Sequence, residues 1–410
     1  MKERRYDIDW LRVIAMLAVF LVHCSRFFCT EDWHLKVPGP EQSEVLRIVR
    51  ELLISLWFME LFFLVSGFAT HYSLRRRSAG QYLLERVKRL LVPLYTVGML
   101  ILVVPQDYLH GLTHGEIAGT FWQWLPTYYR TLPRRILFIW EPLDPASLVP
   151  YTFSGHLWFI QMLFLVSLAA LPLLLWLRTE RGGRFIHRLA GWVARPGGML
   201  IFLVPLAAIR LALGWMPEMN GRSWADFVWF ACLFVIGYIL AADDRFTEAL
   251  KRGGWLYPAL WVGTYVAVGG LLTLVLDYDP TPGHGVSPLY AIWQIGGSVV
   301  QWSAVVSIVS LGARRLNVNN KLLAYANEAV LPFFLFHQTV ILIVGWYVLP
   351  WDIANVFKYL LIALISFPAI LILYEVFVRH IGFMRFLFGM APRKKQPAAA
   401  RGRIEKTVTR

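Results

Sequence analysis

The sequence predicts an all-α polytopic membrane protein with about ten transmembrane helices, and three observations support this fold class. Of the 410 residues, 57% are hydrophobic and only 16% are charged, more apolar surface than a soluble protein of this length can bury. Apolar runs of about 20 residues recur along the chain, and roughly 20 helical residues cross a hydrocarbon core of about 30 Å. The 40 Lys and Arg residues are also distributed unevenly between the segments that connect these runs.

The expected spans lie at residues 9–28, 53–73, 90–105, 154–177, 198–215, 224–242, 255–276, 289–311, 329–349 and 356–378. With the N-terminus placed in the cytoplasm, 29 of the 40 Lys and Arg fall on the inner side, which is the positive-inside pattern. Both termini are then cytoplasmic. Orientation accounts for the net charge of +14, so no nucleic-acid partner is expected. No small-residue cleavage site follows the first apolar run, so we expect a span there and not a removed signal.

The connecting segments predict a single transmembrane domain over residues 1–390, followed by a disordered basic cytoplasmic tail at 391–410. The aromatic outer segment 106–153 predicts an interfacial helix or a loop that caps the outer mouth. The short basic loop 75–89 is expected to meet anionic lipid headgroups or an anionic ligand. The three cysteines have neither a disulfide framework nor a metal-ligand spacing, so no metal is expected.

Ionisable side chains inside predicted spans are the main functional signal. Each costs at least a few kcal/mol in a bilayer, so such residues usually face the bundle interior or a water-filled cavity. The candidates are Asp9, Arg12, His23, Glu60, His156, Arg210, His337 and Glu375. For Glu375, an ion pair with Arg379 at i, i+4 is expected rather than a chemical role.

Arg12 and His23 lie on one face of the first predicted span. Eleven residues at about 100° each leave a net rotation of about 20°, and a rise of about 1.5 Å per residue separates them by roughly 16.5 Å. Arg12 is thus near the inner side and His23 near the outer side. Taken singly, Arg12 could snorkel to headgroups while paired with Asp9, and His23 could be an ordinary interfacial histidine. Their common face favours a joint role.

Five segments, taken in order, resemble those of acyltransferase family 3, the bacterial integral-membrane O-acyltransferases. They are "DIDWLRVIAMLAVFLVH" at 7–23, "ELFFLVSGFA" at 60–69, "LLERVKRLLVPL" at 83–94, "GHLWFIQML" at 155–163 and "PFFLFHQTVIL" at 332–342. The first carries the family's basic residue followed, after ten residues, by His. The resemblance extends over nearly the whole chain and implies a multi-pass enzyme of the bacterial inner membrane.

Two further segments resemble the glucan-biosynthesis branch of this family. They are "EDWHLKVP" at 31–38 and "VRHIGFMRFLFG" at 378–389. This branch implies transfer of a succinyl group, with acetyl as the alternative, to a periplasmic glucan. Glu60 departs from the family pattern, and we expect it to contact a buried cation such as Arg12 or Arg210, or to bind substrate.

The resemblance implies that acyl-CoA is the donor and that a glycan hydroxyl is the acceptor. Arg12 is then expected to bind the nucleotide phosphates through its planar fork of donors, helped by Arg86 and Arg89, although positive-inside topology also accounts for this last pair. The pantetheine arm would follow the face of the first span, placing the thioester near His23. A neutral imidazole can then act as general base.

The remaining substrate contacts are expected at the outer side. His156 and Trp158 are candidates to stabilise the oxyanion, and Trp33 and His34 are candidates to close over the sugar. His337, some eight residues into the ninth expected span from the inner side, is expected to line the path. Ordinary roles remain open for all of them, as belt tryptophans or as packed, hydrogen-bonded histidines.

Two other classes of function compete with acyl transfer. A transporter or exporter of a glycan or small anion also carries isolated Arg and His residues in its spans, but no repeat of two halves is detectable here, as many transporters show. A structural membrane protein would not need the Arg12–His23 face. The sequence leaves open whether the chain forms a homo-oligomer within the lipid bilayer.

Overall fold

The computed structural model describes residues 5–29, 33–35, 57–138, 155–216, 223–276 and 287–392. Every regular element in these ranges is helical, which confirms the predicted all-α class. The α-helices are α1 (Tyr6–Ser25), α3 (Phe58–Arg76), α4 (Ala79–Arg86), α5 (Val103–Thr113), α6 (Phe121–Phe138), α7 (Trp158–Leu177), α8 (Glu180–Val193), α9 (Leu203–Leu213), α10 (Trp224–Ala242), α11 (Asp244–Arg252), α12 (Leu256–Thr264), α13 (Pro288–Arg315), α14 (Lys321–Val348), α15 (Asn355–Leu373) and α16 (Gly382–Leu387).

Short 3₁₀ and π-helical segments extend or join these helices. The 3₁₀ segments are η1 (Arg26–Phe28), η5 (Gly155–Leu157) and η6 (Gly198–Phe202). The π-helical segments are η3 (Val87–Leu91), η4 (Leu94–Leu102), η7 (Tyr265–Val275) and η8 (Tyr374–Arg379). Because α4, η3, η4 and α5 follow one another directly, they form one continuous helical rod of 35 residues, Ala79–Thr113.

In the described ranges, seven helical segments are long and apolar enough to cross a membrane, so the chain is a multi-pass membrane protein. They are Tyr6–Phe28, Ala79–Thr113, Gly155–Leu177, Trp224–Ala242, Pro288–Arg315, Lys321–Val348 and Asn355–Arg379. An eighth span arises if Asp244–Arg252 and Leu256–Leu272, which are bent by 67°, count as one. The two other expected spans are also helical, in α3 and in the shorter apolar stretch Gly198–Leu213.

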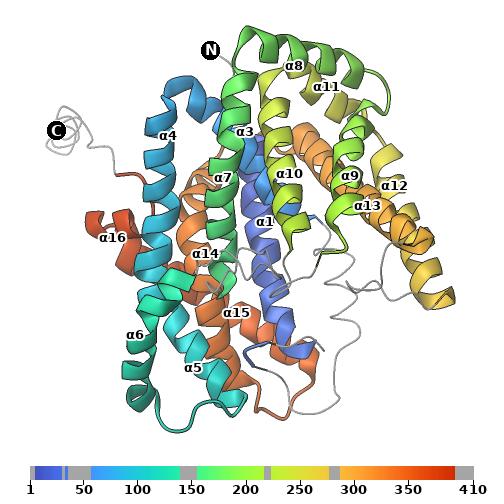
Figure 1. The fold of residues 1–410 in the computed structure, drawn as a ribbon. Coiled ribbons are helices and arrows are strands. Elements are labelled where there is room, and N and C mark those ends of the chain that lie inside the picture. Colours follow the sequence, from blue (N-terminus) through green and yellow to red (C-terminus); the bar gives the residue numbers. More distant parts are fainter. Residues whose placement is uncertain are drawn as a thin grey trace, which may run out of the picture.

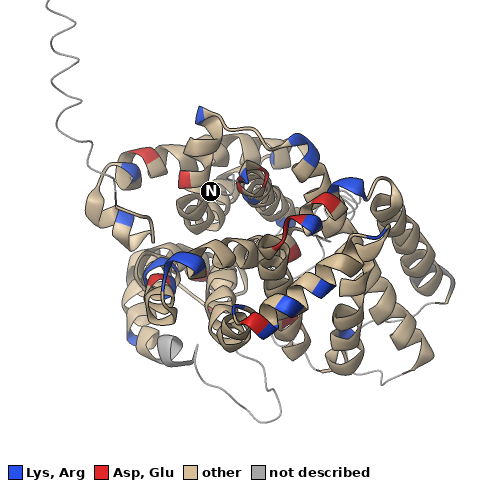
Figure 2. Ribbon diagram, turned by 90° about the horizontal axis from the view of Figure 1, so that it is seen from above, with Lys and Arg blue, Asp and Glu red and all other residues tan. Residues whose placement is uncertain are grey.

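α1 lies in the middle of the bundle and packs against α14, α3, α13 and α15 (Figure 1). α8 and α11 lie across the end of the bundle at which α1 begins, whereas α5 and α6 lie at the opposite end (Figure 1). Seen from the end at which α1 begins, Lys and Arg residues occupy several helices (Figure 2). The expected interfacial segment at 106–153 contains α6, while residues 139–153 lie outside the described ranges, as do residues 393–410 of the predicted tail.

α3 and α10 form the closest helix pair in the bundle because each presents a glycine to the other. A Cβ atom on Gly67 would lie 1.8 Å from the carbonyl oxygen of Phe234, and one on Gly237 would lie 1.9 Å from that of Leu64. The two backbones are therefore in direct contact, as small residues permit between membrane helices. Gly67 and Gly237 therefore set how closely α3 and α10 approach.

Candidate active site

A cavity of about 480 Å³ lies between α1, α3, α7, α14 and the rod that begins at α4. Four arginines line one end of it: Arg12, Arg86, Arg89 and Arg385. Aromatic and aliphatic side chains line the rest, among them Phe62, Phe159 and Phe334. Among the described lining residues, Glu328 supplies the only carboxylate. The cavity therefore has a cationic end and an apolar end.

Arg12 is held at the cationic end by two neighbours. Its guanidinium forms an ion pair with Asp9, 3.1 Å away and one helical turn earlier, as the sequence predicts. It also donates a hydrogen bond to the side-chain oxygen of Asn327 on α14. The two contacts orient Arg12, and the Asp9 carboxylate offsets its charge.

Arg86 and Arg89 reach the same cavity from the junction of α4 and η3. The Ser78 side chain caps α4 in a reciprocal arrangement with Gln81, which sets where this helix starts. Arg86 donates to the Thr70 hydroxyl of α3 at 3.2 Å, and Arg89 lies 3.2 Å from the Glu85 carboxylate. The two predicted phosphate-binding arginines are thus brought together with Arg12, although they belong to different helices.

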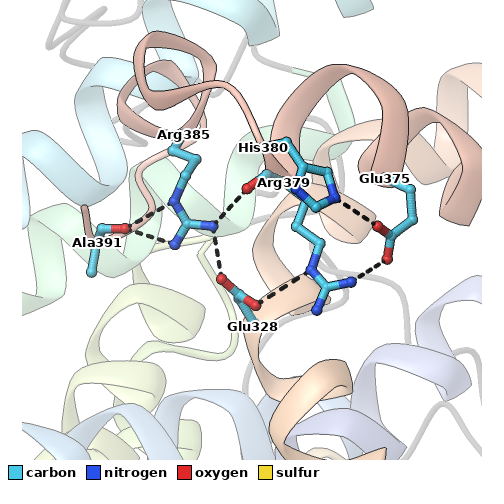
Figure 3. A network of polar contacts seen from close by, with 6 residues as sticks. All are labelled: Glu328, Glu375, Arg379, His380, Arg385 and Ala391. Atoms are coloured by element: carbon cyan, nitrogen blue, oxygen red, sulfur yellow. Dashed lines mark hydrogen bonds and ion pairs between the residues drawn. The ribbon is translucent and has the colours of Figure 1, made fainter. Parts of the chain in front are cut away.

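Arg385 completes the cationic end and was not foreseen as a site residue. Its guanidinium, only 6% exposed, lies 2.7 Å from Glu328 and donates to the carbonyl oxygen of Ala391 (Figure 3). Glu328 also lies 3.9 Å from Arg379, and Arg379 is paired with Glu375 at 2.8 Å, which confirms the predicted i, i+4 contact. This network attaches the segment after α15 to α14 and closes one side of the cavity.

Three histidines gather just beyond the apolar end of the cavity. The ring of His337, on α14, lies 4.8 Å from that of His23 on α1 and 5.2 Å from that of His156 in η5. The ring of Phe334, which lines the cavity, lies 5.4 Å from His337 and 5.9 Å from His156. His23, His156 and His337 are therefore neighbours, and they lie beside the apolar end of the cavity.

Backbone carbonyl groups fix how these three rings present their nitrogens. Nδ1 of His23 lies 2.8 Å from the carbonyl oxygen of Val19, and Nδ1 of His337 lies beside that of Phe334. Nε2 of His156 lies 3.3 Å from the carbonyl oxygen of Leu335. A carbonyl oxygen only accepts, so each of these nitrogens carries the proton in the neutral ring, and the other nitrogen carries a lone pair.

The lone-pair nitrogens of His337 and His156 are enclosed by protein. His337 is fully buried and His156 is 6% exposed, and Nε2 of the former and Nδ1 of the latter have no hydrogen-bond partner among the described residues. No group of three or more His, Cys, Asp or Glu in the described ranges has a geometry suited to a metal ion. The arrangement is suited to accepting hydrogen bonds or a proton from a bound molecule.

Trp33 and His34 cover this cluster from the segment that follows α1. The Trp33 ring lies 6.3 Å from His23 and 5.8 Å from His34. Nε2 of His34 accepts from the side-chain amide of Gln338 at 3.0 Å. Burial, together with the nearby His110 and Arg26, lowers the pKa of His34 from 6.5 to about 3. His34 is therefore neutral throughout the physiological pH range.

The other predicted site residues lie at different distances from this centre. Trp158 begins α7 and packs among aromatic rings, 6.1 Å from that of Phe230. Glu60 is buried in the first turn of α3. Arg210 is paired with Asp226 at 2.9 Å, a partner that lies on α10 and that the sequence did not single out.

A membrane bundle whose cationic cavity ends beside buried histidines is suited to group transfer from an anionic carrier. Residues 5–375 match the acyltransferase domain family known as acyltransferase 3. This chain belongs to that family and is a membrane acyltransferase.

Curated relatives resemble the chain along nearly its whole length. Glucans biosynthesis protein C from Salmonella schwarzengrund (strain CVM19633) and that from Salmonella typhi are each 25% identical over 402 residues, covering 97% of this chain and 97% of theirs. The protein of the same name from Salmonella paratyphi B (strain ATCC BAA-1250 / SPB7) is 24% identical over 411 residues, with the same coverage. No solved structure matches the chain.

Proposed function

We propose that this chain transfers an acyl group from cytoplasmic acyl-CoA to a hydroxyl group of a periplasmic or surface glycan. One observation carries the proposal: a single cavity joins four arginines to an apolar end that lies beside His23, His337 and His156. Acyl-CoA has the matching form, because its nucleotide end is polyanionic and its pantetheine arm is thin and uncharged.

The donor would enter with its phosphates among Arg12, Arg86, Arg89 and Arg385. Arginine suits phosphate because its planar fork offers several donors at once. From Arg12 to His23 the chain rises by roughly 16.5 Å along α1, a distance that an extended pantetheine arm spans. The thioester carbon would then reach the histidines while the phosphates stay at the cationic end.

His23 would act as the general base. Its Nδ1 is engaged with Val19, so Nε2 carries the lone pair and takes the proton of the acceptor hydroxyl as the oxygen attacks the thioester carbon. The carbon–sulfur bond then breaks, and the imidazolium returns the proton to the leaving thiolate. A base of this kind contributes roughly 10²–10⁴-fold to the rate.

The acceptor is proposed to be a glucan because the relatives of 24–25% identity are named for glucan biosynthesis. Trp33 offers an aromatic face to a sugar ring, and the lone pairs of His337 and His156 can accept hydrogen bonds from its hydroxyl groups. Succinyl is the proposed acyl group and acetyl the alternative, and the proposed location is the bacterial inner membrane.

Transfer of labelled acyl groups tests the proposal directly. The purified chain in lipid nanodiscs would receive radiolabelled succinyl-CoA or acetyl-CoA together with a periplasmic glucan, and labelled glucan would be counted. We expect His23→Ala to lower kcat roughly 10²–10⁴-fold. We expect Arg12→Ala to raise the KM for acyl-CoA about 10- to 100-fold, since hydrogen bonds to charged groups contribute about 1.5–3 kcal/mol.

Two exposed residues of α8 provide matched controls. His187→Ala and Arg188→Ala remove the same types of side chain from a surface helix, and both should keep wild-type kinetics. Wild-type transfer by His23→Ala would exclude its role as base. Absence of transfer to any glucan, combined with movement of intact glucan across proteoliposomes, would favour an exporter instead.

A further inference from the structure

A chain of buried amide side chains leads from the rod Ala79–Thr113 to His34. Nε2 of Gln106 donates to the Leu102 carbonyl oxygen at 3.0 Å and to the Thr339 hydroxyl at 2.7 Å. Nε2 of Gln338 donates to Oε1 of Gln106 at 3.1 Å and also lies 3.0 Å from Nε2 of His34. Gln106 and Gln338 are 1% and 2% exposed, so water does not replace these contacts.

This chain of hydrogen bonds determines which nitrogen of His34 carries the proton. The Leu102 carbonyl can only accept, so the atom of Gln106 that faces it must be the amide nitrogen. Oε1 of Gln106 then faces Gln338 and requires a donor, which sets the orientation of the Gln338 amide. The Gln338 nitrogen has no lone pair to offer, so Nε2 of His34 must be unprotonated. The proton of neutral His34 therefore resides on Nδ1.

Nδ1 of His34 is buried and, although the Gln106 backbone carbonyl lies near the ring, it makes no hydrogen bond of normal length and angle with the described residues. Leaving a buried donor unpaired costs about 1–3 kcal/mol, a cost that a bound acceptor atom would remove. The Trp33 ring lies 5.8 Å from that of His34 and 6.3 Å from that of His23, so His34 lies beside the cluster. It therefore differs from the three clustered histidines, which present lone pairs, because His34 presents a proton.

The difference bears on how the oxyanion of the tetrahedral intermediate is stabilised. A neutral His156 presents the lone pair of Nδ1, which would repel a negatively charged oxygen. The expectation that His156 supplies the oxyanion donor therefore conflicts with its contact to Leu335. An N–H group on a ring whose tautomer is fixed in advance is the kind of preorganised donor that stabilises developing charge.

We propose that His34 donates its Nδ1 proton as a hydrogen bond to the acyl carbonyl oxygen of the donor, and that Gln338 and Gln106 are positioning residues that hold His34 in this tautomer. The inference rests on the proposed acyl transfer. As the acceptor oxygen attacks the thioester carbon, the carbonyl electron pair moves onto oxygen, and the His34 N–H bond remains intact while it stabilises that charge.

Two substitutions of His34 separate a donor from a merely structural residue. The side-chain amide nitrogen of Asn can take the place of Nδ1, whereas that of Gln lies nearer the place of Nε2. His34→Gln should lower kcat about 10²–10³-fold, the usual cost of losing one oxyanion donor. His34→Asn should retain at least tenfold more kcat than His34→Gln, and neither should change the KM for acyl-CoA.

Gln338→Met tests the positioning residues without touching His34. It keeps the length of the side chain but removes the amide that excludes a proton from Nε2. We expect ¹⁵N NMR of histidine-labelled protein to show neutral His34 protonated at Nδ1 in the wild type and as a mixture of the Nδ1–H and Nε2–H tautomers in Gln338→Met, with kcat lowered severalfold. Gln301→Met, on α13 at another cavity, is the matched control and should change neither.

The outcomes separate this inference from the proposed function. Protonation of wild-type His34 at Nε2, or equal kcat for His34→Asn and His34→Gln, would overturn the inference even if His23 proves essential. If wild-type protein transfers no acyl group, the proposed function fails, while the tautomer seen by NMR still tests the relay. Size-exclusion chromatography and CoA binding identify any variant that does not fold.

Discussion

The arginine end of the central cavity and the histidine cluster beside its apolar end differ in whether their polar groups have partners. At the cationic end each arginine has a polar partner: Arg12 contacts Asp9, Arg86 the Thr70 hydroxyl, Arg89 Glu85 and Arg385 Glu328. At the histidine end, by contrast, ring nitrogens of His34, His156 and His337 are buried without a partner in the described part of the chain. Both ends lie in the same apolar bundle, so the difference reflects the chemistry of the groups.

An arginine stays charged, and one that is buried, such as Arg385 at 6% exposure, must be compensated even when no ligand is present, because an unpaired buried charge costs several kcal/mol. A neutral histidine with one free nitrogen costs only about 1–3 kcal/mol. The cationic end can therefore bind an anion by exchanging one carboxylate partner for another oxyanion. The histidine end is already oriented and needs no partner to be displaced, which suits a centre that must stabilise a short-lived state.

The largest effect is expected from a substitution that disturbs both ends together. Gly67→Ala would place a Cβ atom 1.8 Å from a backbone oxygen of α10, so α3 and α10 must separate. α3 also forms one wall of the cavity through Phe62 and Ser66. We expect a loss of more than 10 °C in Tm, or failure to fold, together with loss of CoA binding.

Gly80→Ala is the control for this substitution, because a Cβ atom there would meet nothing within 4 Å. It should leave Tm and CoA binding at wild-type values, with a slight gain from the higher helix propensity of alanine. A Gly67→Ala protein with wild-type Tm would show that the helices separate at little cost.

Features that depend on neighbours along the chain could be predicted from the sequence. Each predicted apolar stretch coincides with a helix where the structure describes it, and the ion pairs Asp9–Arg12 and Glu375–Arg379 follow from helical spacing. The common face of Arg12 and His23 also follows from the period of a single helix.

The assembled site could not be predicted in the same way, because its contacts join distant parts of the chain. Gln338 and His34 are 304 positions apart, and Gln106 and Gln338 are 232 apart. No local periodicity indicates that they meet. The break of 67° between Asp244–Arg252 and Leu256–Leu272, by contrast, falls at two consecutive glycines, of which Gly254 has a φ of 52°.

A smaller effect is expected from Glu328→Gln, which tests exchange at the cationic end. The substitution removes the only carboxylate that the described residues contribute to the cavity wall, while keeping the shape of the side chain. The arginines then face an incoming phosphate with one fewer competing anion. We expect CoA to bind about three- to tenfold more tightly at low salt, measured by calorimetry, with the gain shrinking as salt screens the charges.

Asp244→Asn is a suitable comparison, since it neutralises an exposed acidic residue at the start of α11 and should leave CoA binding unchanged. Weaker binding by Glu328→Gln would mean that Glu328 chiefly holds Arg385 in place and that exchange does not occur.

A third effect is expected in the pH dependence of stability, which tests the histidine end. His34 has a pKa of about 3 in the folded chain and about 6.5 when unfolded. Between these values the unfolded chain binds a proton that the folded chain cannot, so His34 lowers the free energy of unfolding as pH falls below about 6.5, by up to about 1.4 kcal/mol per pH unit. His34→Asn removes this contribution, so its Tm should fall less than the wild-type Tm between pH 7 and pH 5.

His187→Asn, at an exposed position on α8, should follow the wild type. Parallel Tm curves for His34→Asn and wild type would mean that His34 accepts a proton in the folded state, and the contrast between a neutral histidine end and a charged arginine end would then be lost.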